Sequence, residues 1–141
     1  MEMTAKQPPS FGYSGTPLLK KLGIKPDARL EFVSPPGNFD ELLGPLPGGT
    51  VTTRKGPLDF AILFVKSKSD LAKRFPTLRD RLESKGMLWV GWPKKTSGIA
   101  SDLTEGVVRE FGLDAGLVDV KICAIDDTWS GLKFVRRLRD R

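Results

Sequence analysis

The run from Leu58 to Val65, LDFAILFV, is apolar at nearly every position rather than at every second one. A strand of this kind is covered on both faces, which is typical of a parallel sheet enclosed by helices. The apolar residues that follow recur at the spacing of one helical face, namely Leu71, Phe75, Leu78 and Leu82. A second apolar run, Met87–Trp92, comes after Lys85-Gly86. The segment therefore predicts a strand, a helix and a parallel strand joined by a right-handed crossover.

Further helices and strands are predicted on both sides of this unit. Before it we expect a helix from Thr16-Pro17 to Gly23, a strand at 29–33, a short helix from Asn38 or Asp40, and an edge strand at 50–53. After it we expect a helix from Ser101 or Asp102 to Gly112, a strand at 116–125, a turn at 126–128 and a strand at 129–137. The short turn makes the last two strands an antiparallel hairpin. Pro76 is expected to kink or split its helix near Arg74–Phe75.

Length and composition indicate an ordinary globular protein. The chain has 141 residues, of which 39% are hydrophobic and 28% charged. We expect residues 1–10 to be a flexible arm and residues 11–141 to form a single α/β domain. No apolar run approaches the roughly 20 residues that span a bilayer, and the N-terminus lacks the apolar centre of a secretory signal. The sequence therefore predicts a cytoplasmic protein that does not bind membranes.

The residue types that are missing exclude several kinds of chemistry. Histidine is absent and Cys123 is the one cysteine, so Ser-His and Cys-His arrangements and four-ligand zinc sites cannot form. Cys123 stands in an apolar strand, where a small buried residue is expected rather than a nucleophile. Acid–base chemistry would fall to Asp, Glu, Lys or Tyr. We assign no catalytic residue, no metal ligand and no cofactor.

The order of these elements resembles the methyltransferase variant of the Rossmann-like fold, whose parallel sheet also ends in an antiparallel hairpin. Leu19–Val33 is similar to the opening of that fold, with a short helix, a lysine-proline turn and the first strand. Leu82–Val90 is similar to a later segment, in which a helix ends in Leu and Lys-Gly precedes an apolar strand. The resemblance implies a three-layer, mostly parallel α/β sheet ending in an antiparallel hairpin.

The chain departs from that family at the cofactor site. The family's first strand leads into a glycine-rich loop, whereas Ser34–Phe39 contains one glycine, and close approach of the backbone to a nucleotide depends on glycines. The segment between Pro35 and Asp59 is too short for the usual strand–helix pairs, and no acidic residue closes a second strand to hold a ribose. The usual cofactor site is therefore expected to be missing.

A second resemblance is carried by four motifs. They are Gly12-Tyr13-Ser14-Gly15-Thr16-Pro17-Leu18, Trp89-Val90-Gly91-Trp92-Pro93-Lys94-Lys95, Asp102-Leu103-Thr104-Glu105 and Asp126-Asp127-Thr128-Trp129-Ser130-Gly131-Leu132. They are similar to an uncharacterised bacterial family, the domain of unknown function numbered 3052, over residues 12–137. That family implies the fold but brings no activity with it.

The predicted site is the rim at the carboxyl ends of the strands, where ligands collect in open α/β sheets. The segments Ser34–Asn38, Lys66–Ser69, Pro93–Gly98 and Asp126–Trp129 should meet there. The candidate ligand-binding residues are Lys94, Lys95, Thr96, Ser97, Gly98, Asp126, Trp129, Trp92 and Tyr13. The lysines, hydroxyls and loop amides, with a helix beginning near Asp102, could hold a phosphate or carboxylate.

Each candidate also has a purely structural explanation. The loop 93–98 could be a solvated loop that caps the next helix, and Asp126 could simply form the hairpin turn. Trp92 and Trp129 could stack on a ring or cover the core, whereas Trp89 is expected in the core. The formal net charge is +6, and the basic residues Lys133, Arg136, Arg137, Arg139 and Arg141 could line a nucleic acid or be solvated.

Three functional hypotheses follow from the sequence. The first is a non-catalytic or degenerate methyltransferase-like domain that binds a small anionic ligand or a protein partner at residues 93–98 and 126–129. The second is a transferase using S-adenosylmethionine in an altered pose, which needs a deep pocket between the strands 29–33 and 58–65. The third, less favoured, is a nucleic-acid-binding module, which needs a contiguous basic face.

Overall fold

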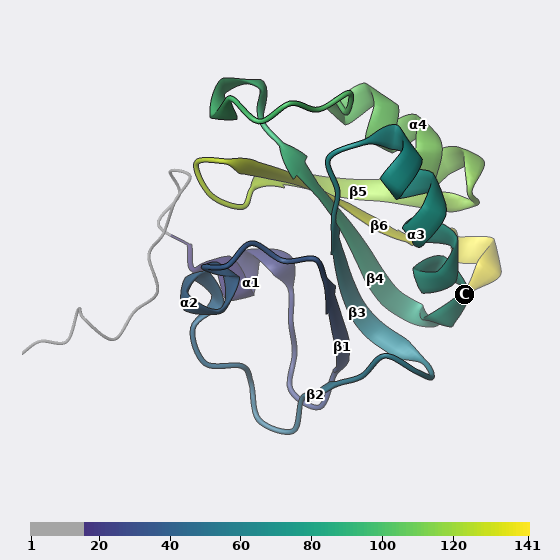
Figure 1. Ribbon diagram of the computed structural model, residues 1–141. Coiled ribbons are helices and arrows are strands. Elements are labelled where there is room, and N and C mark those ends of the chain that lie inside the picture. The colour runs from purple at the N-terminus through teal and green to yellow at the C-terminus, as the bar shows by residue number, and fades with distance from the viewer. Residues whose placement is uncertain (1–15) are drawn as a thin grey trace, which may run out of the picture.

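A six-stranded sheet forms the centre of the computed structural model, which describes residues 16–141 (Figure 1). The strands are β1 (Arg29–Val33), β2 (Val51–Thr52), β3 (Leu58–Phe64), β4 (Leu82–Pro93), β5 (Leu117–Ala124) and β6 (Trp129–Arg136). The helices are α1 (Leu18–Leu22), α2 (Phe39–Leu43), α3 (Lys68–Arg81) and α4 (Glu105–Asp114), with short 3₁₀ turns η2 (Lys95–Ser97) and η3 (Leu138–Asp140). The predicted arm at 1–10 and the candidate Tyr13 lie outside the described residues.

The strands lie in the order β2-β1-β3-β4-β6-β5. β2, β1, β3 and β4 are parallel, and β6 is antiparallel to both β4 and β5. The mostly parallel sheet with an antiparallel terminal hairpin, predicted from the sequence, is therefore confirmed. Because β5 runs in the same direction as β4, the carboxyl ends of β1, β3, β4 and β5 share one edge of the sheet.

Helices cover both faces of the sheet and create two apolar clusters (Figure 1). The short helices α1 and α2 pack on one face, where Phe60, Ile62 and Trp89 are almost fully buried. The longer helices α3 and α4 pack on the other face, against Leu63, Val90 and their neighbours. The Trp89 indole donates a hydrogen bond to the Leu22 carbonyl (2.9 Å), which satisfies its buried N–H. Trp89 is thus in the core, as predicted.

The helix α3 and the strand β4 differ from their predicted bounds. Pro76 does not split α3, which runs through it without a break. β4 begins directly at Leu82 rather than at Met87, and the register with β3 shifts between the pairs Leu58–Leu82 and Phe60–Met87. The extra residues of β4 form an irregularity of the kind that sequence periodicity does not reveal.

The helix α4 begins and ends later than the sequence predicted. The Thr104 hydroxyl accepts from the Val107 N–H (3.2 Å) and caps the helix, so the prediction of a start at Ser101 or Asp102 is wrong. Gly112 does not end α4 but lies inside it. There it is buried against Phe134, and the helix continues to Asp114.

None of the helices formed by residues 16–141 combines the length and apolarity needed to span a membrane.

Candidate functional site

The four loops predicted to form a rim lie at the same edge of the sheet. The Lys94 N–H donates to the Thr128 carbonyl (2.8 Å), and Pro93 pairs with Trp129 across β4 and β6. The Lys68 N–H donates to the Asp102 carboxylate (2.8 Å), which connects the loop after β3 to the segment before α4. The parallel strands therefore bring together residues far apart in the sequence.

A hollow of about 220 Å³ lies at this rim, between the end of β4, the start of α4 and the hairpin. Its lining residues are Trp92, Pro93, Lys94, Lys95, Leu103, Thr104, Glu105, Ile122 and Ser130. We call it the rim hollow. It combines an apolar floor with two lysines. The exposed side chain of Ile122, 45% accessible, extends the apolar surface onto β5.

Six of the nine residues that line the rim hollow were not among the predicted candidates: Pro93, Leu103, Thr104, Glu105, Ile122 and Ser130. The sequence showed that apolar and polar residues alternate around Ile122. It did not show that Ile122 lies beside the end of β4 and the start of α4. Glu105 is held by Arg109 (2.6 Å), which also binds Asp119 (2.8 Å). The hydrogen bonds that Arg109 donates to Asp119 and then to Glu105 raise the pKa of Arg109. Glu105 therefore shares its cation with Asp119, and Lys94 and Lys95 are the cations that line the hollow itself.

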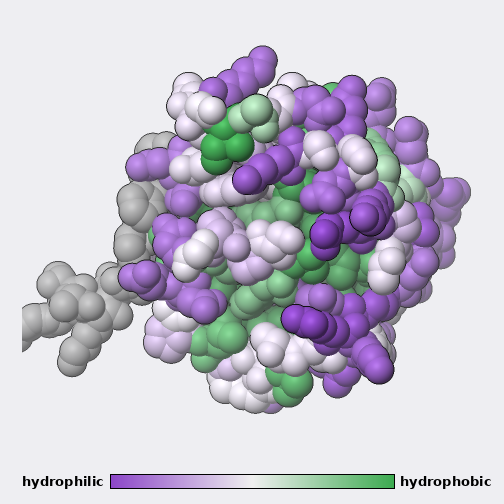
Figure 2. All heavy atoms as spheres, in the orientation of Figure 1, coloured by the Kyte–Doolittle hydropathy of each residue, from purple (hydrophilic) through white to green (hydrophobic). Residues whose placement is uncertain are grey.

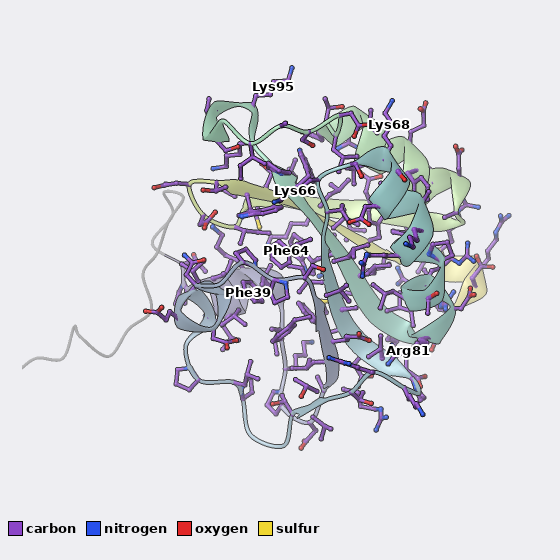
Figure 3. All side chains as sticks on the ribbon, viewed as in Figure 1. Phe39, Phe64, Lys66, Lys68, Arg81 and Lys95 are labelled. Carbon is purple, nitrogen blue, oxygen red and sulfur yellow. The ribbon has the colours of Figure 1, made fainter. Side chains whose placement is uncertain are left out.

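The loop between Pro93 and Gly98 is ordered by its own residues. Ser97 Oγ donates to the Lys94 carbonyl (2.6 Å) and accepts from the Ile99 N–H (3.1 Å). Gly98 has φ 80°, a backbone conformation that favours glycine. Thr96 and Lys95 are exposed, and Figure 3 shows Lys95 at the outer end of the loop. Ser97 and Gly98 therefore shape the loop, whereas the two lysines carry its charge.

The helix predicted to begin near Asp102 begins at Glu105 instead, and Thr104 and Glu105 at its start line the rim hollow. Asp102 reaches across to the start of α3, where Ser67 also caps by accepting from the Asp70 N–H (3.1 Å). The start of α4 is capped by Thr104. These groups satisfy two amides at the start of α3 and one at the start of α4, and the lysine ammonium groups supply the formal positive charge of the rim.

The other candidates at the rim have structural roles. Asp126 Oδ1 accepts from the N–H groups of Thr128 and Trp129 (both 2.8 Å), which is the hydrogen-bonding of a turn. Trp129 and Trp92 are 8% and 5% exposed, so both rings are largely in the core. Among residues 16–141, no group of three Asp, Glu, Cys or His side chains could hold a metal ion.

A row of packed aromatic rings lies at the carboxyl ends of β1 and β3. The ring centroids of Phe32 and Phe39 are 5.3 Å apart, those of Phe39 and Phe64 5.1 Å, and those of Phe64 and Trp129 5.2 Å, all edge to face. Figure 3 labels Phe39 on α2 and Phe64 on the sheet beneath it. We call these four side chains the aromatic row.

Glycine positions explain how the row is accommodated. A Cβ on Gly91 of β4 would stand 3.0 Å from the Phe64 ring, so the glycine makes room for that ring to reach Trp129. By contrast, a Cβ on Gly37, in the loop after β1, would meet no described atom within 4 Å. The one glycine of that loop is therefore not required by close packing within residues 16–141.

Cys123 and the C-terminal arginines fit their structural explanations. Burial raises the pKa of the Cys123 thiol, although Lys21 and Lys121 act in the opposite direction. A raised pKa keeps the sulfur protonated and weakly nucleophilic. Arg136 donates to the carbonyls of Arg79 and Leu82 (both 2.7 Å). Arg79 lies in the last turn of α3, and Leu82 is the first residue of β4.

Two more of the C-terminal arginines bond to backbone carbonyls. On the face shown in Figure 2, groups of hydrophilic side chains are separated by hydrophobic and neutral surface. Arg137 donates to the Leu113 carbonyl (3.1 Å) and Arg141 to the Arg136 carbonyl (2.8 Å), so these side chains are turned back onto the protein.

No family model matches the chain, and no curated protein matches it either. The resemblance to the domain of unknown function 3052 therefore stays a prediction.

Solved methyltransferases, however, have the same fold. The magnesium protoporphyrin IX methyltransferase of Synechocystis PCC 6803, solved with bound S-adenosylhomocysteine, has a TM-score of 0.55 at 12% identity, over 85% of this chain and 78% of that one. Fibrillarin of Aeropyrum pernix, solved with S-adenosyl-L-methionine, has a TM-score of 0.56 at 14% identity, over 84% and 72%. The precorrin-6y C5,15-methyltransferase of Geobacter metallireducens GS-15 has 0.55 at 11%, over 85% and 86%. The chain thus has a methyltransferase-like α/β fold, and at these identities the likeness concerns the fold alone.

Proposed function

We propose that this chain is a non-catalytic, methyltransferase-like domain whose rim hollow binds an anionic group. The group is a phosphate or carboxylate, carried either by a small ligand or by a protein partner. Lys94 and Lys95 supply the positive charge, and the apolar floor around Trp92 receives the adjoining part of the ligand. Mixed sites of this kind, with a few polar groups on an apolar floor, are typical of ligand recognition.

The aromatic row supports the non-catalytic part of the proposal. In open α/β sheets a nucleotide-like cofactor lies outside the carboxyl ends of the strands, close to a glycine-rich loop. Here Phe39, 1% exposed, packs over that end of β1 and β3. The sequence after β2 continues with Thr53-Arg54 and offers no carboxylate to a ribose. A transferase with an altered cofactor pose would need the aromatic row to open.

The single observation that carries the binding part is the rim hollow itself. It joins the end of a central strand, two lysines and an exposed Ile122 at the edge of the sheet where ligands usually collect. Its one carboxylate, Glu105, shares Arg109 with Asp119 and faces two lining lysines. An anion therefore meets net positive charge there, and an apolar neighbour of that anion meets the floor.

A thermal-shift experiment with the purified protein tests the proposal. The probes are pyrophosphate, phenyl phosphate and an acidic peptide with a central leucine. A probe that binds only the folded state raises the free energy of unfolding of the protein by RT ln(1 + [L]/Kd). We expect a shift that Lys94→Ala with Lys95→Ala weakens by about a hundredfold in Kd, since each of the two charged contacts is worth ~1.5 kcal/mol or more. The matched control, Lys55→Ala with Lys73→Ala, removes the same charge from exposed positions elsewhere.

The arms of this experiment separate the two sources of the anion. A shift with the small phosphates indicates a small ligand, and a shift with the peptide alone indicates a protein partner. If no probe shifts the melting temperature, or if the control variant loses as much as the rim variant, the rim hollow is not an anion site.

A further inference from the structure

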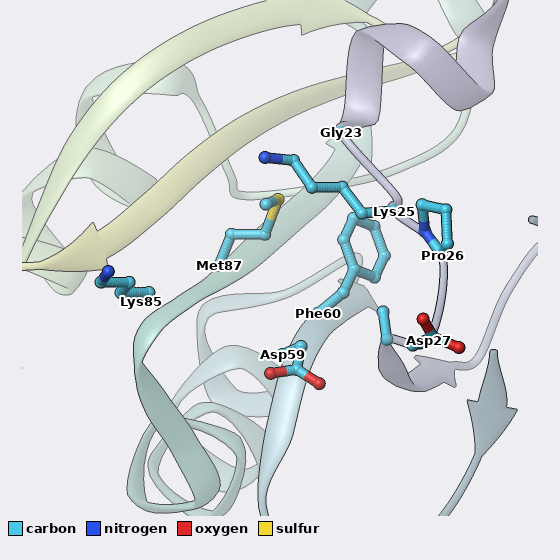
Figure 4. A pocket seen from close by; sticks show the side chains of 9 residues that line it. Gly23, Lys25, Pro26, Asp27, Asp59, Phe60, Lys85 and Met87 are labelled. Carbon is cyan, nitrogen blue, oxygen red and sulfur yellow. The ribbon is translucent and has the colours of Figure 1, made fainter. Parts of the chain in front are cut away.

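A second and larger hollow lies at the opposite, amino-terminal edge of the sheet. Its volume is about 360 Å³. It is lined by Gly23, Lys25, Pro26, Asp27, Ala28, Asp59, Phe60, Lys85 and Met87 (Figure 4). We call it the amino-edge hollow. It lies between the turn after α1 and the first residues of β3 and β4, and none of the rim residues belongs to it.

Four lysines lie where α1 and the turn after it meet the hairpin, namely Lys21, Lys25, Lys121 and Lys133, and Lys25 is the one that lines the hollow. Among residues 16–141, no carboxylate lies within ion-pair distance of any of them. Lys21 donates to the Ala124 carbonyl (3.1 Å) and Lys121 to the Lys21 carbonyl (2.8 Å), so backbone oxygens hold these two. The ammonium groups of Lys25 and Lys133 have no hydrogen-bond acceptor among the described residues.

Lys133 reaches the wall of the hollow from the inner strand β6. Its Nζ lies 3.9 Å from the place that a Cβ on Gly23 would occupy, and the sulfur of Met87 lies 3.4 Å from the same place. Lys25 and Lys85 line the hollow directly. The ammonium groups of Lys25 and Lys133 therefore lie on the Met87 side of the hollow, and Lys85 lines another part of it.

Placing lysines together without a carboxylate raises the free energy of the folded protein. The pKa of Lys133 is lowered by burial and then by the charges of Lys121 and Lys25, in agreement with this geometry. A bound anion would offset the repulsion and supply the missing acceptors.

We propose that the amino-edge hollow binds a small organic anion with a single phosphate or carboxylate group. That group lies between Lys25 and Lys133, and the apolar part of the ligand lies along Pro26 and Met87. Asp27 and Asp59 lie at the end of the hollow away from the Lys25 ammonium, as Figure 4 shows. Their charges disfavour a second anionic group, which makes the site selective for compounds with one anionic end.

The test uses the methyl groups of methionine as reporters. The chain has three methionines, and Met87 is the one among the described residues. In protein labelled with ¹³C at the methionine methyls, Met87→Leu identifies the reporter signal. Phenyl phosphate, inorganic phosphate and phenol are titrated in parallel. We expect a saturable shift of the Met87 signal with phenyl phosphate, a weaker response to phosphate, and none that saturates with phenol.

Lysine variants decide whether the cluster is responsible. Lys133→Gln and Lys25→Gln should each weaken the binding of phenyl phosphate by about tenfold, because each removes a charged contact. Lys73→Gln, an exposed control on α3, should not change it. Unchanged affinity in both cluster variants, or a Met87 shift no more saturable than that of the other methionines, would mean adventitious binding only and would overturn the inference.

The rim variant separates this site from the proposed function. Lys94→Ala with Lys95→Ala should leave the Met87 titration intact. If the rim variant abolishes the Met87 response instead, the ligand binds at the rim, and the inference fails while the proposed function stands. If no probe binds at the rim hollow but the Met87 signal titrates, the proposed function fails and this inference stands.

Discussion

Lys133 is the residue with the least favourable surroundings among the described lysines. It is half-buried on an inner strand and faces the charges of Lys25 and Lys121. This residue therefore links the stability of the free protein to occupancy of the amino-edge hollow.

Replacing Lys133 should stabilise the ligand-free protein. Because the pKa of Lys133 is lower in the folded than in the unfolded chain, the unfolded chain binds more protons between the two values. Stability from this residue therefore increases as the pH rises through that window. Lys133→Gln should unfold at a slightly higher temperature at neutral pH, and its advantage should shrink as the pH approaches about 10.

The measurement is thermal unfolding of both proteins across this pH range. The effect should be small, since solvent screens a half-exposed ammonium. Lys73→Gln is the control for the loss of one positive charge. A Lys133→Gln variant that is less stable at neutral pH would contradict this explanation.

At the scale of elements, α4 depends on one close contact with the sheet. A Cβ on Gly112 would stand 2.0 Å from the ring of Phe134, which is fully buried and contacts Phe75. The ring cannot move without disturbing the core. Gly112 was predicted to end this helix, but its small size is needed inside the helix instead.

Gly112→Ala should therefore destabilise the protein by about 1–3 kcal/mol or more through overpacking. Gly106→Ala, in the same helix, is the matched control, because its Cβ would meet only Thr104 Oγ1 at 4.0 Å. That change should stabilise by roughly 0.5–1 kcal/mol through helix propensity. Denaturant unfolding gives both values. Similar effects of the two substitutions would show that α4 does not pack as closely as described.

The sequence predicted elements well where local pattern determines them. The apolar run of β3, the stripe of α3 and the hairpin of β5 and β6 all follow from periodicity and turn residues. The start of α4 could not be predicted, because Asp102 bonds to Lys68, 34 positions away. The early start of β4 and its irregularity depend on pairing with β3, which no local pattern encodes.

The candidate site was predictable in outline but not in detail. Parallel strands place their carboxyl ends together, so the rim loops could be listed from the sequence. Which side chains can contact a ligand there depends on their other contacts. Asp126 accepts hydrogen bonds within the turn, and Trp129 packs in the aromatic row. The amino-edge hollow was missed, because nothing in the spacing of Lys25 and Lys133 indicates that they meet.

At the scale of the whole molecule, the chain is a methyltransferase-like fold reduced at its first half. Only Val51–Thr52 stands between β1 and β3 as a strand, and α2 has 5 residues. The second half contains α3, α4 and the hairpin and carries the rim hollow.

We predict that this protein does not bind an adenosyl cofactor at the carboxyl ends of β1 and β3. Calorimetric titration of the protein with S-adenosylhomocysteine tests it most directly. With the aromatic row packed there, we predict no saturable heat up to millimolar ligand. A one-to-one isotherm that saturates would contradict the account and would favour a transferase whose Phe39 moves aside for its cofactor.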